Sequence, residues 1–224
     1  MSKITALEPQ KRKGRLNVFV DGRFVIGVGE AVAADLRLVV GRQIDGDRLR
    51  EIVAAEEQNK AYESALRSLE TRPRAEQEIQ RKLKTAGYDE TIIRSVIDKL
   101  KRLELLDDEA FAAQWVESRA RVEGSRPVGR RRIAQELFQK GVDKETADGA
   151  IGSVSDDDEY ALALAAARKK VRAVPSDPEA LAVERRKLIA FLQRRGFGWS
   201  TVKAVSADVL GGAVDDFDEP PDES

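Results

Sequence analysis

The chain has 224 residues, of which 35% are charged and 5% are aromatic, and its formal net charge is −1. This length allows one or two domains with a real core, and the balanced charge by itself implies no partner. The sequence contains no histidine, no cysteine and no Gly-Lys pair. These absences exclude Ser-His-Asp and Cys-His catalysis, disulfides, the usual zinc ligands and a Walker A loop.

The first 60 residues predict a small element made of a β-hairpin and a helix. Two β-prone runs in LNVFVDGRFVIGV flank Asp21 and Gly22, and Asp-Gly is a strong signal for a two-residue hairpin turn. Because a two-stranded hairpin is marginal alone, we expect it to pack on a helix within residues 29–38. Residues 49–69 predict either one long helix or two that meet near Lys60. The leading segment lacks the apolar core of a signal peptide.

After residue 60 the chain repeats one helical pattern three times. Gly87, Gly141 and Gly196 lie 54 and 55 residues apart, and each follows a leucine by four residues and another aliphatic by eight. Apolar residues at i and i+4 share a helix face, and glycine supplies the left-handed turn that ends a helix. Each unit therefore predicts three helices of a tandem array. The aliphatic positions are Ile79, Leu83, Ile133, Leu137, Leu188 and Leu192. The units open on Tyr62, Phe111 and Tyr160, which we interpret as core residues.

These patterns predict a mainly α fold, with three tandem three-helix repeats in an elongated array preceded by a small N-terminal β-hairpin and helix element. The expected boundaries are 1–60 for the N-terminal element, 61–106, 107–155 and 156–212 for the repeats, and 213–224 for an acidic tail. The tail carries six acids and no base, so we expect it to be disordered. Without those six acids, 39 basic residues face 34 acidic ones, a net charge of +5.

Three consecutive arginines, at 130–132, stand where we expect a helix to begin. A helix N-terminus favours acidic side chains, and each misplaced exposed charge costs roughly a few tenths of a kcal/mol. The aligned positions are also basic in the third repeat, but they are Glu-Gln-Glu in the first. We interpret the basic positions as contacts for an anionic surface, with a solvated charged face as the alternative. Neighbouring cations extend the candidate set, which is Arg130, Arg131, Arg132, Arg185, Arg186, Lys187, Arg194, Arg195, Lys82, Arg119 and Arg121.

Two stretches of the sequence resemble the RecX family of bacterial regulators of the RecA recombinase. The first is ALRSLETRPRAEQEIQRKLKTAGYDETIIRSVIDKLKRLELLDDEAFAAQWVESR, at 65–119, and the second is RRRIAQELFQKGV, at 130–142. The resemblance covers about residues 16–209, is weakest in the third repeat and does not include the acidic tail. Ala75 departs from the family pattern, which often has a serine there that would cap a helix.

The resemblance implies an elongated array of three-helix repeats that docks along a RecA–DNA filament. Proteins of this family suppress the ATP hydrolysis, strand exchange and coprotease activity of RecA and help its filament to disassemble. The chain is then expected to be a regulator, not an enzyme, without a cofactor or metal. Its expected partners are the RecA nucleoprotein filament and, weakly, single-stranded DNA, with no membrane contact. We expect a monomer in the cytoplasm, which the lack of cysteine fits.

Two other functions stay open. An autonomous DNA-binding module of helical repeats would bind naked DNA tightly and with a steep dependence on salt. A carboxylate–metal nuclease would need clustered acids to hold Mg²⁺. Asp156, Asp157, Asp158 and Glu159 form such a run. We interpret this run as a solvated linker that leads into an acidic helix start.

Overall fold

The computed structural model describes residues 2–121 and 126–212, and it divides into two units. The first unit holds residues 1–74 and 78–106, and the second holds residues 75–77 and 107–224. The predicted acidic tail, 213–224, lies outside the described residues. Within the described part of the chain, no helix is long and apolar enough to cross a membrane.

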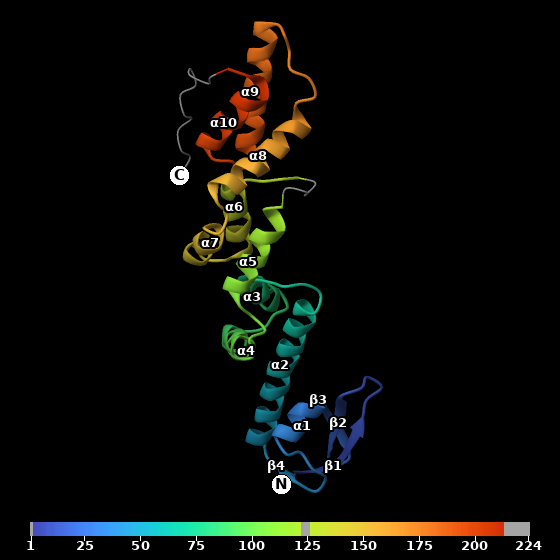
Figure 1. Cartoon of the computed structure of the whole chain (residues 1–224). Helices are drawn as coiled ribbons and strands as arrows, with labels where there is room; N and C mark the ends of the chain where they lie inside the picture. The colour runs from blue at the N-terminus through green and yellow to red at the C-terminus, as the bar shows by residue number, and fades with distance from the viewer. Residues whose placement is uncertain (1, 122–125, 213–224) are drawn as a thin grey trace. The chain divides into compact units, whose positions relative to one another are not determined.

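The first unit begins with an antiparallel sheet of four strands in the order β3-β2-β1-β4 (Figure 1). The strands are β1 (Ser2–Pro9), β2 (Arg15–Val20), β3 (Arg23–Gly29) and β4 (Gln43–Ile44). Asp21 and Gly22 form the predicted turn between β2 and β3, with φ of 49° and 77°. The sequence prediction missed β1. Its pairing with β2 adds the third strand that an isolated hairpin needs for stability.

A single long helix, α2 (Gly46–Leu69), follows the sheet and the short helix α1 (Glu30–Asp35). Near its start, Ile52 joins the core formed by the sheet and α1. Further along, Ala61 and Ala65 join the core of the first repeat. The alternative of two helices that meet near Lys60 is therefore wrong, because one helix continues through that position.

A buried ion pair fastens α2 to the sheet. The Glu56 carboxylate is 1% exposed and accepts a hydrogen bond from the Gly29 N–H (2.8 Å) and another from Arg15 Nη2 (2.5 Å). Buried charges are tolerated where they are paired and hydrogen-bonded, as here. The bonds fix the end of β3, and hence the start of α1, against the middle of α2.

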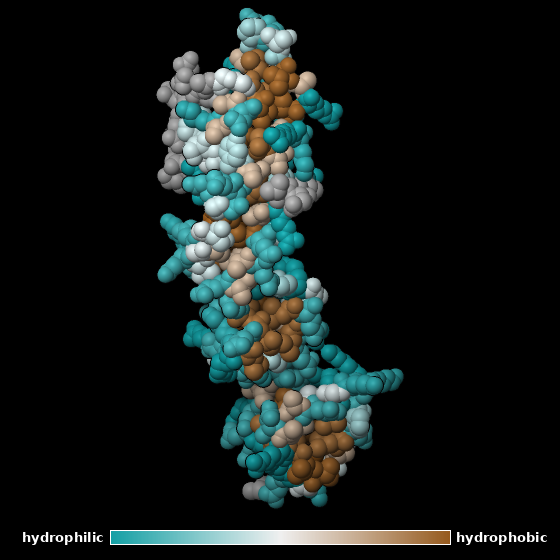
Figure 2. Space-filling model, viewed as in Figure 1, coloured by the Kyte–Doolittle hydropathy of each residue, from teal (hydrophilic) through white to brown (hydrophobic). Residues whose placement is uncertain are grey.

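The three repeats follow the predicted register. Gly87, Gly141 and Gly196 have φ of 90°, 93° and 80°, the left-handed conformation that ends a helix. All six predicted aliphatic positions, four and eight residues before these glycines, are 0% exposed. Phe111 is 6% exposed, and Tyr62 and Tyr160 pack at the edges of cores. Figure 2 shows brown, apolar residues gathered between teal, hydrophilic ones in both units.

The helices of the repeats pack around separate cores. The helices are α3 (Glu76–Thr85), α4 (Glu90–Arg102), α5 (Asp108–Arg119), α6 (Arg130–Lys140), α7 (Lys144–Ile151), α8 (Asp156–Lys170), α9 (Pro178–Arg194) and α10 (Trp199–Leu210). In the first unit, α3 and α4 close over the end of α2. In the second unit, α5, α6 and α7 form one three-helix repeat, and α8, α9 and α10 form the next (Figure 1).

Candidate nucleic-acid interface

The start of α6, which carries the arginine cluster Arg130–Arg132, receives its negative charge from another helix. The first turn of α6 has no acidic residue, and its N-cap is a glycine. Glu159 of α8 is 5% exposed; one of its oxygens accepts a hydrogen bond from the Arg130 N–H (3.1 Å), and the other lies 3.3 Å from Arg130 Nε. Asp156 of α8 pairs with the same guanidinium. These carboxylates stabilise the N-terminus of α6. They also pair with the Arg130 side chain, so the protein itself holds Arg130 in place.

Backbone contacts strengthen this junction between the second and third repeats. The Gly129 N–H donates to the Arg195 carbonyl (2.9 Å), and the Arg131 N–H donates to the Gly196 carbonyl (3.1 Å). A Cβ on Gly129 would lie 2.3 Å from the Gly196 carbonyl oxygen, and one on Gly196 would lie 2.3 Å from the Arg132 nitrogen. Only glycine allows so close an approach at these two positions. The start of α6 therefore packs directly on the turn that follows α9.

The same kind of contact recurs at the start of α3, among residues that belong to the second unit. The Glu76 N–H donates to Asp108 Oδ1 of α5 (2.8 Å). A Cβ on Gly141 would lie 2.3 Å from the Gln77 Cβ. Ala75 is 0% exposed and packs into the core of the second repeat. Asp108 of α5 thus gives the first N–H of α3 an acceptor, at a helix start where Ala75 has no side-chain oxygen to offer.

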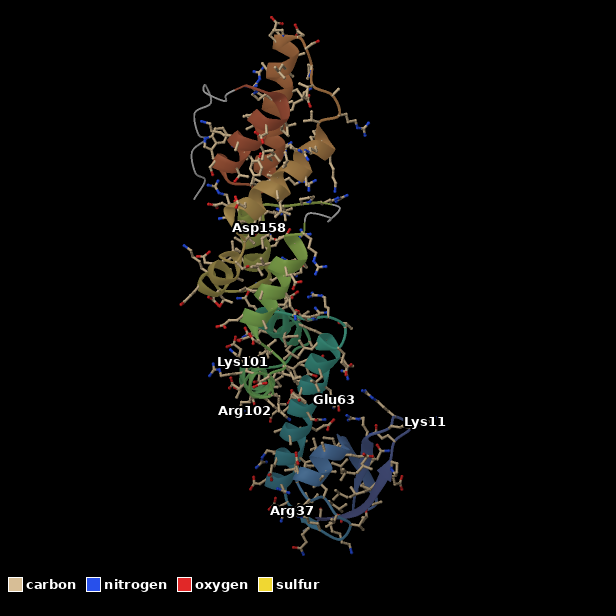
Figure 3. The ribbon with its side chains drawn as sticks, in the orientation of Figure 1. Lys11, Arg37, Glu63, Lys101, Arg102 and Asp158 are labelled. Atoms are coloured by element: carbon tan, nitrogen blue, oxygen red, sulfur yellow. The ribbon has the colours of Figure 1, made fainter. Side chains whose placement is uncertain are left out.

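The acidic run at 156–159 differs in part from its predicted role. Ser155 caps α8 and exchanges hydrogen bonds with Asp158, which is labelled in Figure 3. The interpretation as a solvated segment is wrong for Glu159, because that side chain is buried against the start of α6. Within residues 2–121 and 126–212, no group of three or more acids is placed to hold a metal ion.

A second carboxylate, Glu136 of α6, balances two further candidate cations. Its oxygens accept hydrogen bonds from Arg119 Nε (2.8 Å) and Nη2 (2.5 Å) and from Trp115 Nε1 (3.2 Å). Arg132 Nε lies 3.4 Å from the same carboxylate. Burial raises the pKa of Glu136, but the hydrogen bonds and charge of Arg119, with help from Trp115 and Arg132, outweigh burial and lower it overall. Arg119 and Arg132 therefore have an internal partner.

Residues 185–187 align with the arginine cluster, but the prediction that they also stand at a helix start is wrong. Helix α9 begins at Pro178, where Asp177 caps it and Glu179 lies in its first turn. Residues 185–187 lie two turns further in, where the helix N-terminus exerts little influence. Arg186 is exposed, Arg185 donates to the Gly211 carbonyl and Lys187 lies 3.8 Å from Glu184.

The remaining predicted cations have varied surroundings. In the first unit, Lys82 contacts the Ser68 hydroxyl. In the second unit, Arg121 pairs with Glu117 (3.0 Å), Arg194 is exposed, and Arg195 donates to the Pro127 carbonyl (3.2 Å). The predicted set is therefore distributed over several local environments, and most members contact neighbouring groups of the same chain.

Three cations that the sequence prediction omitted lie around Arg195. Arg126, Lys169 and Lys170 line one pocket with it in the second unit. The run ARKKVR at the end of α8 was a visible sign of charge, but helix C-termini commonly carry cations. Arg126 stands alone in the sequence beside Pro127. Only the packing of α9 against the segment before α6 brings these residues together.

The architecture defines a protein of the helical-repeat class, with a small sheet element followed by three three-helix units that turn at glycine. The family model for the RecX N-terminal domain matches residues 2–45. The models for the first, second and third three-helix domains of RecX match residues 61–100, 107–151 and 156–205. The chain therefore belongs to the RecX family of regulatory proteins, as the sequence resemblance indicated.

Individual relatives agree with this assignment. The regulatory protein RecX of Limosilactobacillus reuteri (strain DSM 20016) is 32% identical over 94% of this chain and 78% of its own length. That of Clostridium botulinum (strain Alaska E43 / Type E3) is 31% identical over 94% and 97%. A crystal structure of a regulatory protein RecX is similar, with a TM-score of 0.75, 30% identity and coverage of 92% of this chain and 98% of that one. RecX from Lactobacillus salivarius shares the fold, with a TM-score of 0.60 and 22% identity over 69% of this chain and 97% of its own.

Proposed function

We propose that this chain regulates the RecA recombinase by binding along the RecA–single-stranded DNA filament and suppressing its ATP hydrolysis, strand exchange and coprotease activity. The observation that carries the proposal is the match of RecX family models to the N-terminal element and to each of the three repeats. The relatives are named regulatory proteins, which supports a regulator rather than an enzyme. We infer that it acts as a monomer in the cytoplasm.

The repeats offer a physical basis for binding a filament. Hydrogen bonds between the start of α6 and the turn after α9 fix two repeats of the second unit against each other. Exposed cations such as Arg186 and Arg194 on that unit can then contact a repeating anionic partner at set spacing. Each contact raises the effective concentration for the next, so weak individual contacts add to useful avidity. Direct contact with single-stranded DNA is expected to be weak by comparison.

The decisive experiment measures RecA-dependent ATP turnover on single-stranded DNA as the full chain is added. We expect turnover to fall, and the chain to sediment with the filament over the same concentration range. A chain with Arg186→Glu and Arg194→Glu is expected to lose both effects while its melting temperature stays the same. Unchanged turnover with no co-sedimentation at saturating chain would refute the proposal, and a rise in turnover would refute the suppressive role.

An autonomous DNA-binding module is a second candidate, favoured by the cations gathered around Arg195. It predicts naked-DNA binding as tight as filament binding, with a strong dependence on salt. Comparing the affinities for DNA alone and for the RecA filament in the same buffer separates the two candidates. The regulator predicts the higher affinity for the filament.

A further inference from the structure

A basic pocket lies within the second unit, between α8, α9 and the segment that precedes α6. Its volume is about 220 Å³. Among the described residues that line it, four carry cationic side chains and none is acidic. The lining residues are Arg126, Pro127, Ala166, Lys169, Lys170, Phe191 and Arg195. This arrangement concentrates positive charge around a recess rather than spreading it over an open helix face.

Three of the four cations that line the basic pocket have no carboxylate partner among the residues that the structure describes. Within the described part of the chain, Arg126, Lys170 and Arg195 form no ion pair with a carboxylate. Burial lowers the pKa of Arg195, and the positive charges of Arg126 and Arg119 lower it further. The C-terminal ends of α8 and α9 offset only about half a charge each. These three cations, against roughly one negative charge from the helix ends, leave a site that an anion would stabilise.

An aromatic ring fixes two of these cations in place. The Arg195 guanidinium lies 5.0 Å from the centroid of the Phe191 ring, and Lys170 Nζ lies 5.9 Å from it. Cation–π attraction holds both groups at the pocket wall and reduces the entropy that they lose on binding a ligand. Arg195 also donates to the Pro127 carbonyl, which joins the wall to the segment that carries Arg126. The cations are thus partly ordered before any ligand binds.

We propose that the basic pocket binds backbone phosphates of a single-stranded nucleic acid. Guanidinium and ammonium groups together are suited to phosphate oxygens, through forked hydrogen bonds and compact charge. A single strand is flexible enough to turn its phosphates into a recess, whereas the phosphates of a duplex lie on a stiff convex surface. The inference deepens the proposed function by naming the nucleic acid strand as the group that this pocket contacts. Its test needs no RecA, so failure of either idea can be distinguished.

The test measures binding of a fluorescent oligothymidylate to the full chain by anisotropy, between about 50 and 200 mM salt. The pocket variant is Arg126→Gln with Lys170→Gln, two exposed side chains whose loss should leave the fold intact. The matched control is Lys11→Gln with Arg102→Gln, which removes the same charge from exposed positions of the first unit. Both residues are labelled in Figure 3. Melting temperatures of all three proteins confirm that the fold is retained.

We expect the pocket variant to lose about tenfold in affinity at low salt, and the control to change less than twofold. The slope of log affinity against log salt should fall in magnitude by about 0.7 for each phosphate contact removed, hence by about 1.4. An equal loss in the control, or an unchanged slope, would overturn the proposal.

Competitors identify the ligand chemistry. An oligothymidylate with a neutral methylphosphonate backbone should fail to compete. A duplex of equal length should compete, but through contacts outside the pocket, which the pocket variant retains. Polyglutamate that competes as well as the oligonucleotide would instead identify a site for acidic protein segments. A duplex that loses the same tenfold in the pocket variant would also contradict the assignment to single strands.

Discussion

The arginine cluster and the basic pocket are two cationic regions of the second unit that differ in what balances their charge. Arg130 pairs with Asp156 and Glu159, and Arg132 lies beside Glu136. The four cations of the basic pocket are gathered without an acidic side chain among the described residues that line it. A density of cations is therefore a weak guide to an anion site. The better guide is whether the protein already supplies the counter-charge.

The comparison implies different roles for the two regions. At the arginine cluster, the acids of α8 hold the start of α6 and join two repeats, so its disruption should lower stability. At the basic pocket, removal of a cation relieves repulsion, so its disruption should affect binding and leave stability almost unchanged. This separation predicts effects on the free energy of unfolding that decrease from the arginine cluster to the basic pocket.

The largest effect is expected from the core that supports the arginine cluster. Leu137→Ala should lower the free energy of unfolding by about 2–5 kcal/mol, because Leu137 is 0% exposed and its removal leaves a cavity under α6. Its neighbour Phe138 is 74% exposed, so Phe138→Ala should change stability by less than about 0.5 kcal/mol. Urea unfolding measures both. Equal effects would mean that the register of α6 is wrong.

The buried acid at the junction comes next. Glu159→Gln should cost about 1–3 kcal/mol, because the variant loses the charge that both Arg130 and the helix start require. Asp157→Asn changes a neighbouring exposed acid and should cost less than about 1 kcal/mol. A double-mutant cycle with Arg130→Gln should show coupling between residues 130 and 159. Additive effects would show that residues 130 and 159 do not interact.

Charge reversal at Arg130 distinguishes the two views of the cluster most directly. Dipole reasoning from the sequence predicts that glutamate at residues 130–132 slightly stabilises the free protein. The structure predicts the opposite for Arg130→Glu, a loss of about 1–2 kcal/mol, since the new carboxylate would face Asp156 and Glu159. Arg186→Glu, on an exposed helix position, should be nearly neutral. Stabilisation by Arg130→Glu, measured by thermal unfolding, would contradict the assigned contacts.

Glu136 provides a pH-dependent test of similar size. Its pKa is lowered in the folded protein, so its stabilising contribution is present above the unfolded value of about 4.3 and is lost as pH falls through the folded value. Glu136→Gln should therefore cost about 1–2 kcal/mol near pH 7. The difference from the unmodified chain should shrink below about pH 4. A difference that is constant from pH 3 to 7 would show that the charge of Glu136 is not involved.

The smallest effect concerns the basic pocket. Inorganic phosphate should stabilise the folded chain, by about 0.4 kcal/mol at a concentration equal to its Kd. The variant with Arg126→Gln and Lys170→Gln should show no such gain, and at low salt it should be as stable as the unmodified chain or slightly more so. If the variant is clearly less stable in the absence of phosphate, the pocket cations contribute to folding, and the contrast with the arginine cluster fails.

Much of the fold follows from the sequence alone, because the decisive interactions are local. The spacing of aliphatic residues and glycine identifies helix faces and helix ends within about ten residues, and all three repeats agree with it. The Asp21-Gly22 turn is local in the same sense. Strand β1 escaped notice because its segment becomes a strand through pairing with β2 and β4, which come later in the chain.

The placement of functional charge depended on tertiary structure. Residues 185–187 lie as far before a glycine as the arginine cluster does. Helix α9 begins earlier than that distance predicts, so these residues lie in the middle of a helix. Arg130 and Glu159 are 29 residues apart, and only packing of α6 against α8 joins them. The sequence by itself determined the family, the repeat and the number of cations. Tertiary structure decided which cations are neutralised, because electrostatic pairing depends on distance in space rather than along the chain.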